Sequence, residues 1–121
     1  MRWRALSARR RSVRDAFGAD AKDRPYNRLV AILVDDPLWH WRGRRWCHLI
    51  SDFSLDELHE FAQSIGIPRR GFQGDHYDVP EEHRPTVVAA GAEQVSSREL
   101  LRRLRDGGLR LSPAQRRAFK D

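Results

Sequence analysis

Cysteine and long apolar runs are both scarce in this sequence of 121 residues. Cys47 is the only cysteine, so no disulfide can form within the chain, and a reducing compartment is the expected setting. The longest uninterrupted apolar run, Leu29–Val34, is far too short to cross a membrane as a helix. No apolar stretch of signal-peptide length follows the basic N-terminus. We therefore expect a cytoplasmic protein without a membrane partner, and the oligomeric state is left open.

Net charge is also missing from most of the sequence. The whole chain has 23 basic and 17 acidic residues, a formal charge of +6. Residues 1–29 contain nine of the basic and only three of the acidic residues, so residues 30–121 contain fourteen of each. A neutral segment lacks the broad positive field on which non-specific phosphate binding depends. The overall charge is therefore no argument for nucleic-acid binding by residues 30–121, although local arginine patches could still hold phosphate.

Residues 1–29 show no hydrophobic periodicity, which predicts a basic, disordered or loosely helical extension. An alternative interpretation is that translation begins at Val30, just before the first strand. The length leaves room for one core, and we assign it to a single domain over residues 30–106. Residues 107–121 are predicted to be a C-terminal tail in which Ser112-Pro113 begins a short helix.

Short patterns within the domain predict alternating strands and helices. The apolar run Val30–Val34 is typical of a strand buried on both faces of a parallel sheet. Capping boxes, in which a serine and a glutamate three residues apart satisfy free amides, begin helices at Ser54–Glu57 and Ser96–Glu99. Further candidates are strands at residues 69–73 and 93–95, an extended piece at Trp46–Ile50, a loop or hairpin around Gly43, and a helix from Asp78 to Ala90 with Pro85 in its first turn. The predicted fold class is α/β: a small two- or three-layer fold with a short, mostly parallel sheet of about three strands and three to four helices.

Polar side chains follow the expected strands, and in a parallel sheet such positions meet at one edge. Asp35 and Asp36 come directly after the first strand, and His76 and Asp78 lie beyond the second. Carboxylates together with an imidazole suit a divalent cation such as Mg²⁺, Mn²⁺ or Zn²⁺. We therefore predict a metal site formed by Asp35, Asp36, His76 and Asp78, with the first three as catalytic residues.

Other interpretations of these residues stay open. They could hydrogen-bond a substrate without a metal, or Asp35 and Asp36 could serve only a turn. Asp78, with Glu81 three residues later, also fits the N-cap of a helix, and a capping carboxylate is poorly placed to bind a metal. A purely structural role for His76 fits the sequence as well.

Aromatic and basic residues alternate in the segment from Trp39 to Trp46. Such a segment could stack a base and hold a phosphate, and the predicted ligand-binding residues are Trp41, Arg44, Arg45, His48 and Gln73. The alternative is that the tryptophans close the edge of the core while the arginines extend into water. The first interpretation predicts a nucleotide or single-stranded nucleic acid as ligand, and the second predicts none.

The neighbours Cys47 and His48 suggest a nucleophile with its base. Adjacent residues of an extended chain point to opposite faces, so this pair cannot act as such a couple by itself. We instead expect Cys47 to be a buried small apolar residue and His48 to face either solvent or the site.

Several motifs together resemble a small bacterial family known as domain of unknown function 4031. They are Val34-Asp-Asp36, Gly43, Trp46-Cys-His-Leu49, Asp52, Leu58-His59, Phe61-Ala62, Phe72-Gln73, His76-Tyr-Asp78 and Gly91-Ala92. The resemblance spans about residues 31–105, and it implies a start just before the first strand, in line with translation from Val30. Pro85 departs from the unbroken helix that the resemblance implies there. The resemblance brings no activity with it.

The leading hypothesis is a metal-assisted hydrolase or phosphoesterase that acts on a nucleotide or small phosphorylated molecule, with Arg44 or Arg45 holding the phosphate. A first alternative is a non-catalytic module that binds a nucleotide or another protein through the segment of tryptophans and arginines. A second alternative is a nucleic-acid-binding domain that uses this segment together with residues 1–29.

Overall fold

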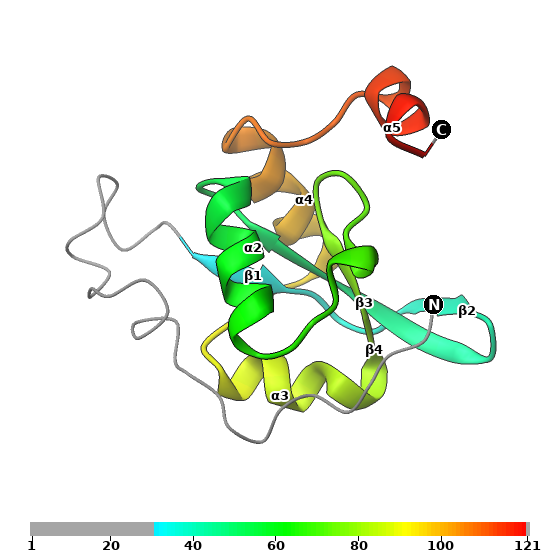
Figure 1. The fold of residues 1–121 in the computed structure, drawn as a ribbon, viewed down its shortest axis with the longest axis vertical. Helices are drawn as coiled ribbons and strands as arrows, with labels where there is room; N and C mark the ends of the chain where they lie inside the picture. Colours follow the sequence, from blue (N-terminus) through cyan, green and yellow to red (C-terminus); the bar gives the residue numbers. More distant parts are fainter. Residues whose placement is uncertain (1–30, 121) are drawn as a thin grey trace.

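A sheet covered by helices forms most of the computed structural model, which describes residues 31–120 (Figure 1). The predicted extension over residues 1–29 and the alternative start at Val30 lie outside the described residues. Within residues 31–120, no helix is both long and apolar enough to cross a membrane.

Strand β3 (Arg44–Ser51) is the centre of the sheet. It pairs antiparallel with β1 (Ile32–Val34) and β2 (Trp39–Trp41) along one edge, and with β4 (Tyr77–Pro80) along the other. β5 (Glu93–Gln94) pairs with β1 and is parallel to it. The predicted α/β class is confirmed. The prediction of a mostly parallel sheet with fewer strands is wrong, because the described residues form a mixed sheet of five strands.

A tight turn explains why β3 runs antiparallel to β2. Arg42 and Gly43 both have positive φ angles, 52° and 74°, and they connect β2 to β3. Two successive left-handed residues are typical of the two-residue turns that join hairpin strands. The hairpin alternative for the segment around Gly43 is therefore the correct one. The turn returns the chain directly along itself, without the helical crossover that parallel strands require.

The described residues contain four α-helices: α2 (Leu55–Ser64), α3 (Arg84–Ala89), α4 (Ser97–Asp106) and α5 (Pro113–Lys120). Both predicted capping boxes begin a helix, since the hydroxyls of Ser54 and Ser96 each accept the amide of the residue three positions on, at 3.0 Å. Ser112 accepts the amide of Gln115 at the start of α5 in the same way, at 3.1 Å.

Two predicted elements differ in the structure. Residues 69–73 are not a strand but a 3₁₀ turn, Arg69–Gly71, followed by a single bridge between Phe72 and Tyr77. Asp78 does not cap a helix, because it lies inside β4. Tyr77 and Val79 on either side of it are buried in the core, so the two-residue period of a strand prevails over the local capping pattern. The next helix starts six residues later, after a 3₁₀ turn at Glu81–His83, and Pro85 lies in its first turn as predicted.

The helices form layers on both faces of the sheet (Figure 1). α2 and α3 cover one face and share its core with Ile32, Val34, Cys47 and Leu49. α4 covers the other face, where Leu100 and Leu104 pack against Leu33 and Ile50. Because strand residues alternate between the faces, the even-numbered residues of the middle of β3 point toward α4. His48 is one of them.

The segment after α4 is held against the rest of the molecule. The backbone amide of Leu111 donates to Asp75 Oδ2 at 2.9 Å, and the Phe119 ring meets the Phe72 ring edge-on with centroids 5.6 Å apart. Gly74 lies beneath both contacts, since a Cβ atom there would stand 2.6 Å from Leu111 and 3.3 Å from Phe119. The predicted short helix is present as α5, and the segment that carries it is fixed to the loop before β4.

Candidate functional site

A row of polar side chains crosses the sheet on the face that α4 covers. His48 of β3 lies directly opposite Asp78 of β4 in the register of the two strands. Asp35 follows the last residue of β1 and donates its amide to the His48 carbonyl at 3.2 Å, so it lies beside His48 on the other edge of β3. Cross-strand neighbours of this kind are close enough for their side chains to touch.

His76 joins this row from the loop that leads into β4. It precedes Asp78 by two residues, and such residues of an extended chain share a face. Its ring meets the His48 ring edge-on, with centroids 5.1 Å apart. His48, His76 and Asp78 each offer one potential ligand atom, and these atoms all lie within 4.8 Å of one another. We refer to these three residues as the His–His–Asp group.

Each imidazole of the group is held through Nδ1 by a separate buried carboxylate. His48 Nδ1 donates to Asp35 Oδ2 at 2.9 Å, and His76 Nδ1 donates to Asp75 Oδ1 at 2.7 Å. Asp35 is 1% exposed and Asp75 is fully buried. With Nδ1 fixed as the donor, Nε2 of each ring is the nitrogen left for another partner.

The two orienting carboxylates are themselves fixed by further hydrogen bonds. Asp35 Oδ1 accepts the backbone amide of His48 at 2.6 Å, and its Oδ2 also accepts the Ser97 hydroxyl at 2.9 Å. The guanidinium Nε of Arg84 donates to the Asp35 carbonyl at 2.9 Å. Asp35 therefore receives contacts from β3, α3 and α4, and these leave its side chain little freedom.

Asp78 is the carboxylate of the group without a full set of partners. It is buried, and its Oδ1 accepts no well-aligned hydrogen bond from any residue that the structure describes. His76 Nε2 lies 3.0 Å from that oxygen, within ion-pair distance. A buried carboxylate oxygen without a hydrogen bond is costly unless a cation compensates its charge.

The charges around His76 change its protonation in the metal-free protein. Burial alone would lower its pKa, but the Asp75 and Asp78 carboxylates outweigh burial and raise the pKa from 6.5 to about 9. The pKa of Asp75 is lowered despite its burial, because His76 and the Leu111 amide hydrogen-bond to it. Without a metal, the His76 imidazolium therefore supplies the positive charge between these carboxylates at neutral pH.

A cavity of about 260 Å³ opens beside the group. Asp35, His48, His76 and Ser97 form its polar side, and the apolar side is Ile50 with three leucines of α4, Leu100, Leu101 and Leu104. Arg110 completes the lining. A small molecule placed here would contact apolar carbon on one side and His48 and His76 of the group on the other.

The structure thus brings four of the predicted site residues together, namely Asp35, His48, His76 and Asp78. The reason is not the edge of a parallel sheet, which the prediction assumed, but antiparallel pairing of β3 with β1 and β4. Asp36 does not join them. Its side chain is 57% exposed and lies 3.7 Å from Arg84.

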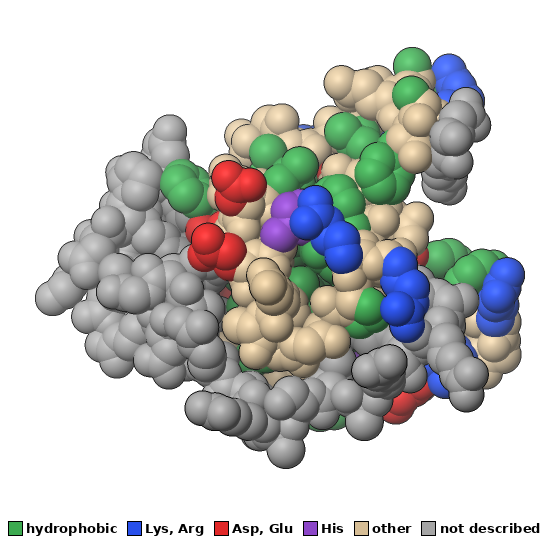
Figure 2. All heavy atoms as spheres, viewed as in Figure 1, with side chains coloured by type: hydrophobic (Ala, Val, Ile, Leu, Met, Phe, Trp, Pro, Cys, Tyr) green, Lys and Arg blue, Asp and Glu red, His purple; other side chains and the backbone are tan. Residues whose placement is uncertain are grey.

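The remaining predicted ligand-binding residues lie apart from the cavity. Trp41 belongs to the hairpin and stacks on Trp39, which also stacks on the His48 ring with centroids 5.8 Å apart. Arg44 pairs with Glu82 at 3.1 Å, and Arg45 is exposed on the same strand. Figure 2 shows basic side chains over the hairpin at the right of the view. Gln73 contributes its backbone amide to the His76 carbonyl at 2.7 Å, which helps to shape the loop.

Sequence reasoning missed three residues around the group: Asp75, Ser97 and Arg110. Asp75 is adjacent to His76, and a carboxylate next to a histidine was the signal that could have found it. In the sequence Ser97 is only part of a capping box, and its contact with Asp35 depends on how α4 docks on the sheet. Nothing in the sequence around Arg110 distinguishes it from the other arginines of the C-terminal segment.

Cys47 takes no part in the site. It is fully buried on the opposite face, and its Sγ donates to the Val79 carbonyl at 3.4 Å. Burial first, and then the Asp35 charge, raise the pKa of the thiol from 9.0 to about 12, so the thiolate is not formed near neutral pH. The expectation of a buried small residue is confirmed.

Comparisons with known proteins identify a family without a known activity. A search of curated proteins and a search of solved structures found no match to this chain. The family model described as "Protein of unknown function (DUF4031)" matches residues 32–107, which include every residue of the His–His–Asp group and both orienting aspartates. The match covers more than half of the sequence and agrees with the resemblance noted from the motifs. The chain therefore belongs to this family of proteins of unknown function.

Proposed function

We propose that the His–His–Asp group binds a divalent metal ion and that the protein is a metal-assisted hydrolase acting on a nucleotide or small phosphorylated molecule. One observation carries the proposal: two converging imidazoles are each oriented through Nδ1 by their own buried carboxylate. Histidines that bind a metal through Nε2 almost always donate their other nitrogen to such an acceptor, which fixes the tautomer and the ring orientation. Asp78 Oδ1 accepts no well-aligned hydrogen bond and lies 3.0 Å from His76 Nε2, so a metal ion in place of the His76 proton would keep its charge compensated.

The ligand set narrows the choice of metal. Two imidazole nitrogens and one carboxylate suit Zn²⁺, Mn²⁺ or Fe²⁺, whereas Mg²⁺ prefers oxygen ligands and retains several waters. Three protein ligands leave at least one coordination position for water or substrate. Of the predicted metals, Zn²⁺ and Mn²⁺ are therefore favoured over Mg²⁺. Asp35 and Asp36, predicted as ligands, are replaced in this proposal by His48.

A metal bound here would polarise a substrate oxygen and lower the pKa of its bound water, which supplies a nucleophile near neutral pH. The residues of the chain provide the rest. Asp35 and Asp75 hold the imidazoles in the binding tautomer, and Ser97 holds Asp35. The leucines of α4 form the apolar side of the cavity, so a substrate bound against them would displace water from beside the group.

Calorimetric titration of the full chain with Zn²⁺, Mn²⁺ and Mg²⁺ tests the proposal. We expect one site per chain that prefers Zn²⁺ or Mn²⁺, and we expect Asp78→Asn and His48→Gln each to weaken it by at least about tenfold. Asp36→Asn is the matched control, because this neighbouring carboxylate is exposed and outside the group. Equal metal affinity in the wild type and in Asp78→Asn would refute the site.

Hydrolysis of a chromogenic phosphate ester, with and without the preferred metal, then separates an enzyme from a binding module. A metal-dependent rate that is lost in Asp78→Asn supports the hydrolase. Metal binding without turnover of phosphate monoesters, phosphate diesters or nucleotides would instead favour the non-catalytic alternative.

A further inference from the structure

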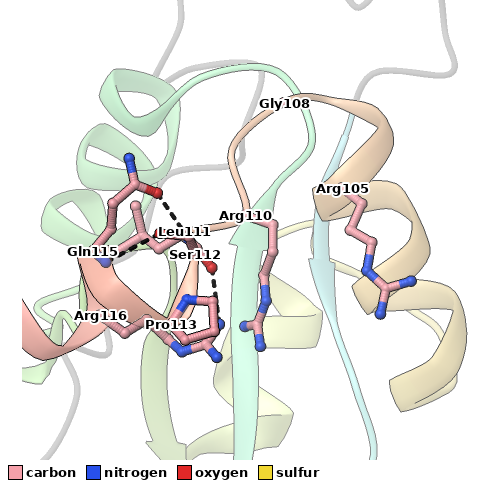
Figure 3. Close-up of a pocket in the computed structure, with 8 residues that line it drawn as sticks. All are labelled: Arg105, Gly108, Arg110, Leu111, Ser112, Pro113, Gln115 and Arg116. Atoms are coloured by element: carbon pink, nitrogen blue, oxygen red, sulfur yellow. Dashed lines mark hydrogen bonds between the residues drawn. The ribbon is translucent and has the colours of Figure 1, made fainter.

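A second cleft lies next to the cavity of the His–His–Asp group, between the end of α4 and the start of α5 (Figure 3). It has a volume of about 470 Å³ and is lined by Arg105, Gly108, Arg110, Leu111, Ser112, Pro113, Gln115 and Arg116. Three of these residues are arginines and none is acidic. We call this space the arginine cleft.

Arg110 belongs to both spaces, because it lines the cavity beside the group as well as the arginine cleft. Its Nη1 lies 3.6 Å from Asp75 Oδ2. Asp75 is also the carboxylate that holds His76, and it accepts the Leu111 amide at 2.9 Å. One buried aspartate therefore connects the arginine cleft with the His–His–Asp group.

The walls of the cleft are set by the backbone rather than by loose side chains. Gly107 lies so close to the β3–α2 connection that a Cβ atom would stand 2.5 Å from the Asp52 carbonyl. Gly108 has a φ of +76°, the left-handed conformation with which the chain leaves α4. Arg116 donates from Nη1 to the Leu111 carbonyl at 2.9 Å, which fixes α5 to the segment just before it. These contacts hold the backbone that lines the cleft.

Positive charge in the cleft is only partly compensated. Within residues 31–120, Arg105 makes no ion pair, and Arg116 contacts a backbone carbonyl rather than a carboxylate. Asp75, the carboxylate that pairs with Arg110, is shared with His76. Figure 3 shows the Arg105 and Arg110 side chains reaching in the same direction from the end of α4 and from the segment that follows it. Guanidinium groups match the oxygens of a phosphate in geometry as well as in charge.

We propose that the arginine cleft binds a phosphate group of the substrate that is not itself attacked, with Arg105, Arg110 and Arg116 as the recognising residues. This inference rests on the proposed function, because it takes the His–His–Asp group as the reacting centre. The metal ligands do not line the arginine cleft, so a phosphate held there lies outside the reacting centre. The substrate class is then a small molecule with a terminal phosphate, a carbon part that fits against the leucines of α4, and a hydrolysable bond beside His48 and His76.

Phosphate binding to the full chain in the presence of a chelator tests the cleft separately from the metal. The probes are inorganic phosphate, a sugar monophosphate and a nucleoside monophosphate, followed by calorimetry or by amide shifts in nuclear magnetic resonance. We expect at least one monophosphate to bind without metal, with Arg105→Gln and Arg110→Gln each weakening it by about tenfold. The probe that binds most tightly distinguishes a sugar phosphate from a nucleotide.

Arg98→Gln is the matched control, because it removes an exposed arginine of α4 that lines neither the cleft nor the cavity. Equal weakening by Arg98→Gln would show unspecific attraction and overturn the inference. So would binding that requires the metal and is lost in Asp78→Asn, since the phosphate would then sit on the metal itself. Arg105 is exposed, so Arg105→Gln is expected to keep the melting temperature and to remain informative if Arg110→Gln does not fold. If metal binding fails but a monophosphate binds through the cleft, the proposed function falls and the phosphate site of the cleft stands.

Discussion

The two faces of the sheet are built from the same strands but differ in what they bury. Among the described residues, fourteen form the core on the face of α2 and α3, whereas four form the core on the face of α4. β3 contributes Cys47 and Leu49 to the first face and His48 and Ile50 to the second. The α2 face is an ordinary close-packed interior. On the α4 face, a row of polar side chains takes the place of part of the apolar core. These side chains are Asp35, His48, His76 and Asp78.

This difference shows how a small domain can hold a buried polar group. Buried ionised side chains destabilise a fold unless hydrogen bonds and opposite charges compensate them. Here the larger core supplies most of the apolar burial, and the polar row is compensated internally through Asp35, Asp75 and His76. We expect stability to depend mainly on the α2 face and metal binding on the α4 face.

The largest expected effect is on the α2 face. Phe61→Ala removes a fully buried aromatic ring from the core, and we expect the free energy of unfolding to fall by about 3–5 kcal/mol. Urea denaturation with and without metal measures this loss. The metal affinity of the molecules that remain folded should not change. If it fell with the stability, the two faces would not be separable in the way proposed here.

The next prediction concerns the α4 face, where we expect the stability of the fold to depend on pH through His76. In metal-free protein the pKa of His76 is raised from 6.5 to about 9, so its protonated form stabilises the fold. That stabilisation is complete below pH 6.5, declines as the pH rises, and is absent above pH 9. Its size corresponds to roughly 3 kcal/mol. Denaturation at a series of pH values in chelator should show the decline.

His76→Gln should remove this pH dependence, because glutamine does not titrate. His40→Gln, which replaces an exposed histidine of β2, is the control and should leave the decline in place. A bound metal should also flatten the profile, since a metal takes the place of the proton on His76. A wild-type profile that is already flat between pH 6.5 and 9 would contradict the charged state assigned to His76.

Local patterns were enough to predict two helices of this fold, α2 and α4. Ser54 and Ser96 begin α2 and α4 because a cap depends on residues three positions apart, which the sequence displays directly. The sheet was harder to predict from the sequence. The antiparallel pairing of β3 depends on the turn at Arg42 and Gly43 and on contacts between residues that are distant in the sequence. The predicted alternation of strands and helices therefore led to the wrong sheet topology.

Only part of the candidate site could be predicted for the same reason. His76 and Asp78 share a face by their two-residue spacing, but that inference requires a strand, and the local capping pattern suggested a helix. His48 meets them only through the register of β3 with β4. The two orienting aspartates are recognisable as such only after the rings have been placed.

The smallest of these effects is predicted for the carboxylate behind His48. Asp35→Asn keeps the size of the side chain but weakens the charged hydrogen bond to His48 Nδ1, so we expect metal affinity to fall between about 10- and 100-fold. Asp36→Asn, at the adjacent and exposed position, should leave it unchanged. Metal titration of both variants at one pH measures the difference. Equal affinities would mean that Asp35 only secures β1 to β3 through the His48 amide, and the polar row would then be structural at that end.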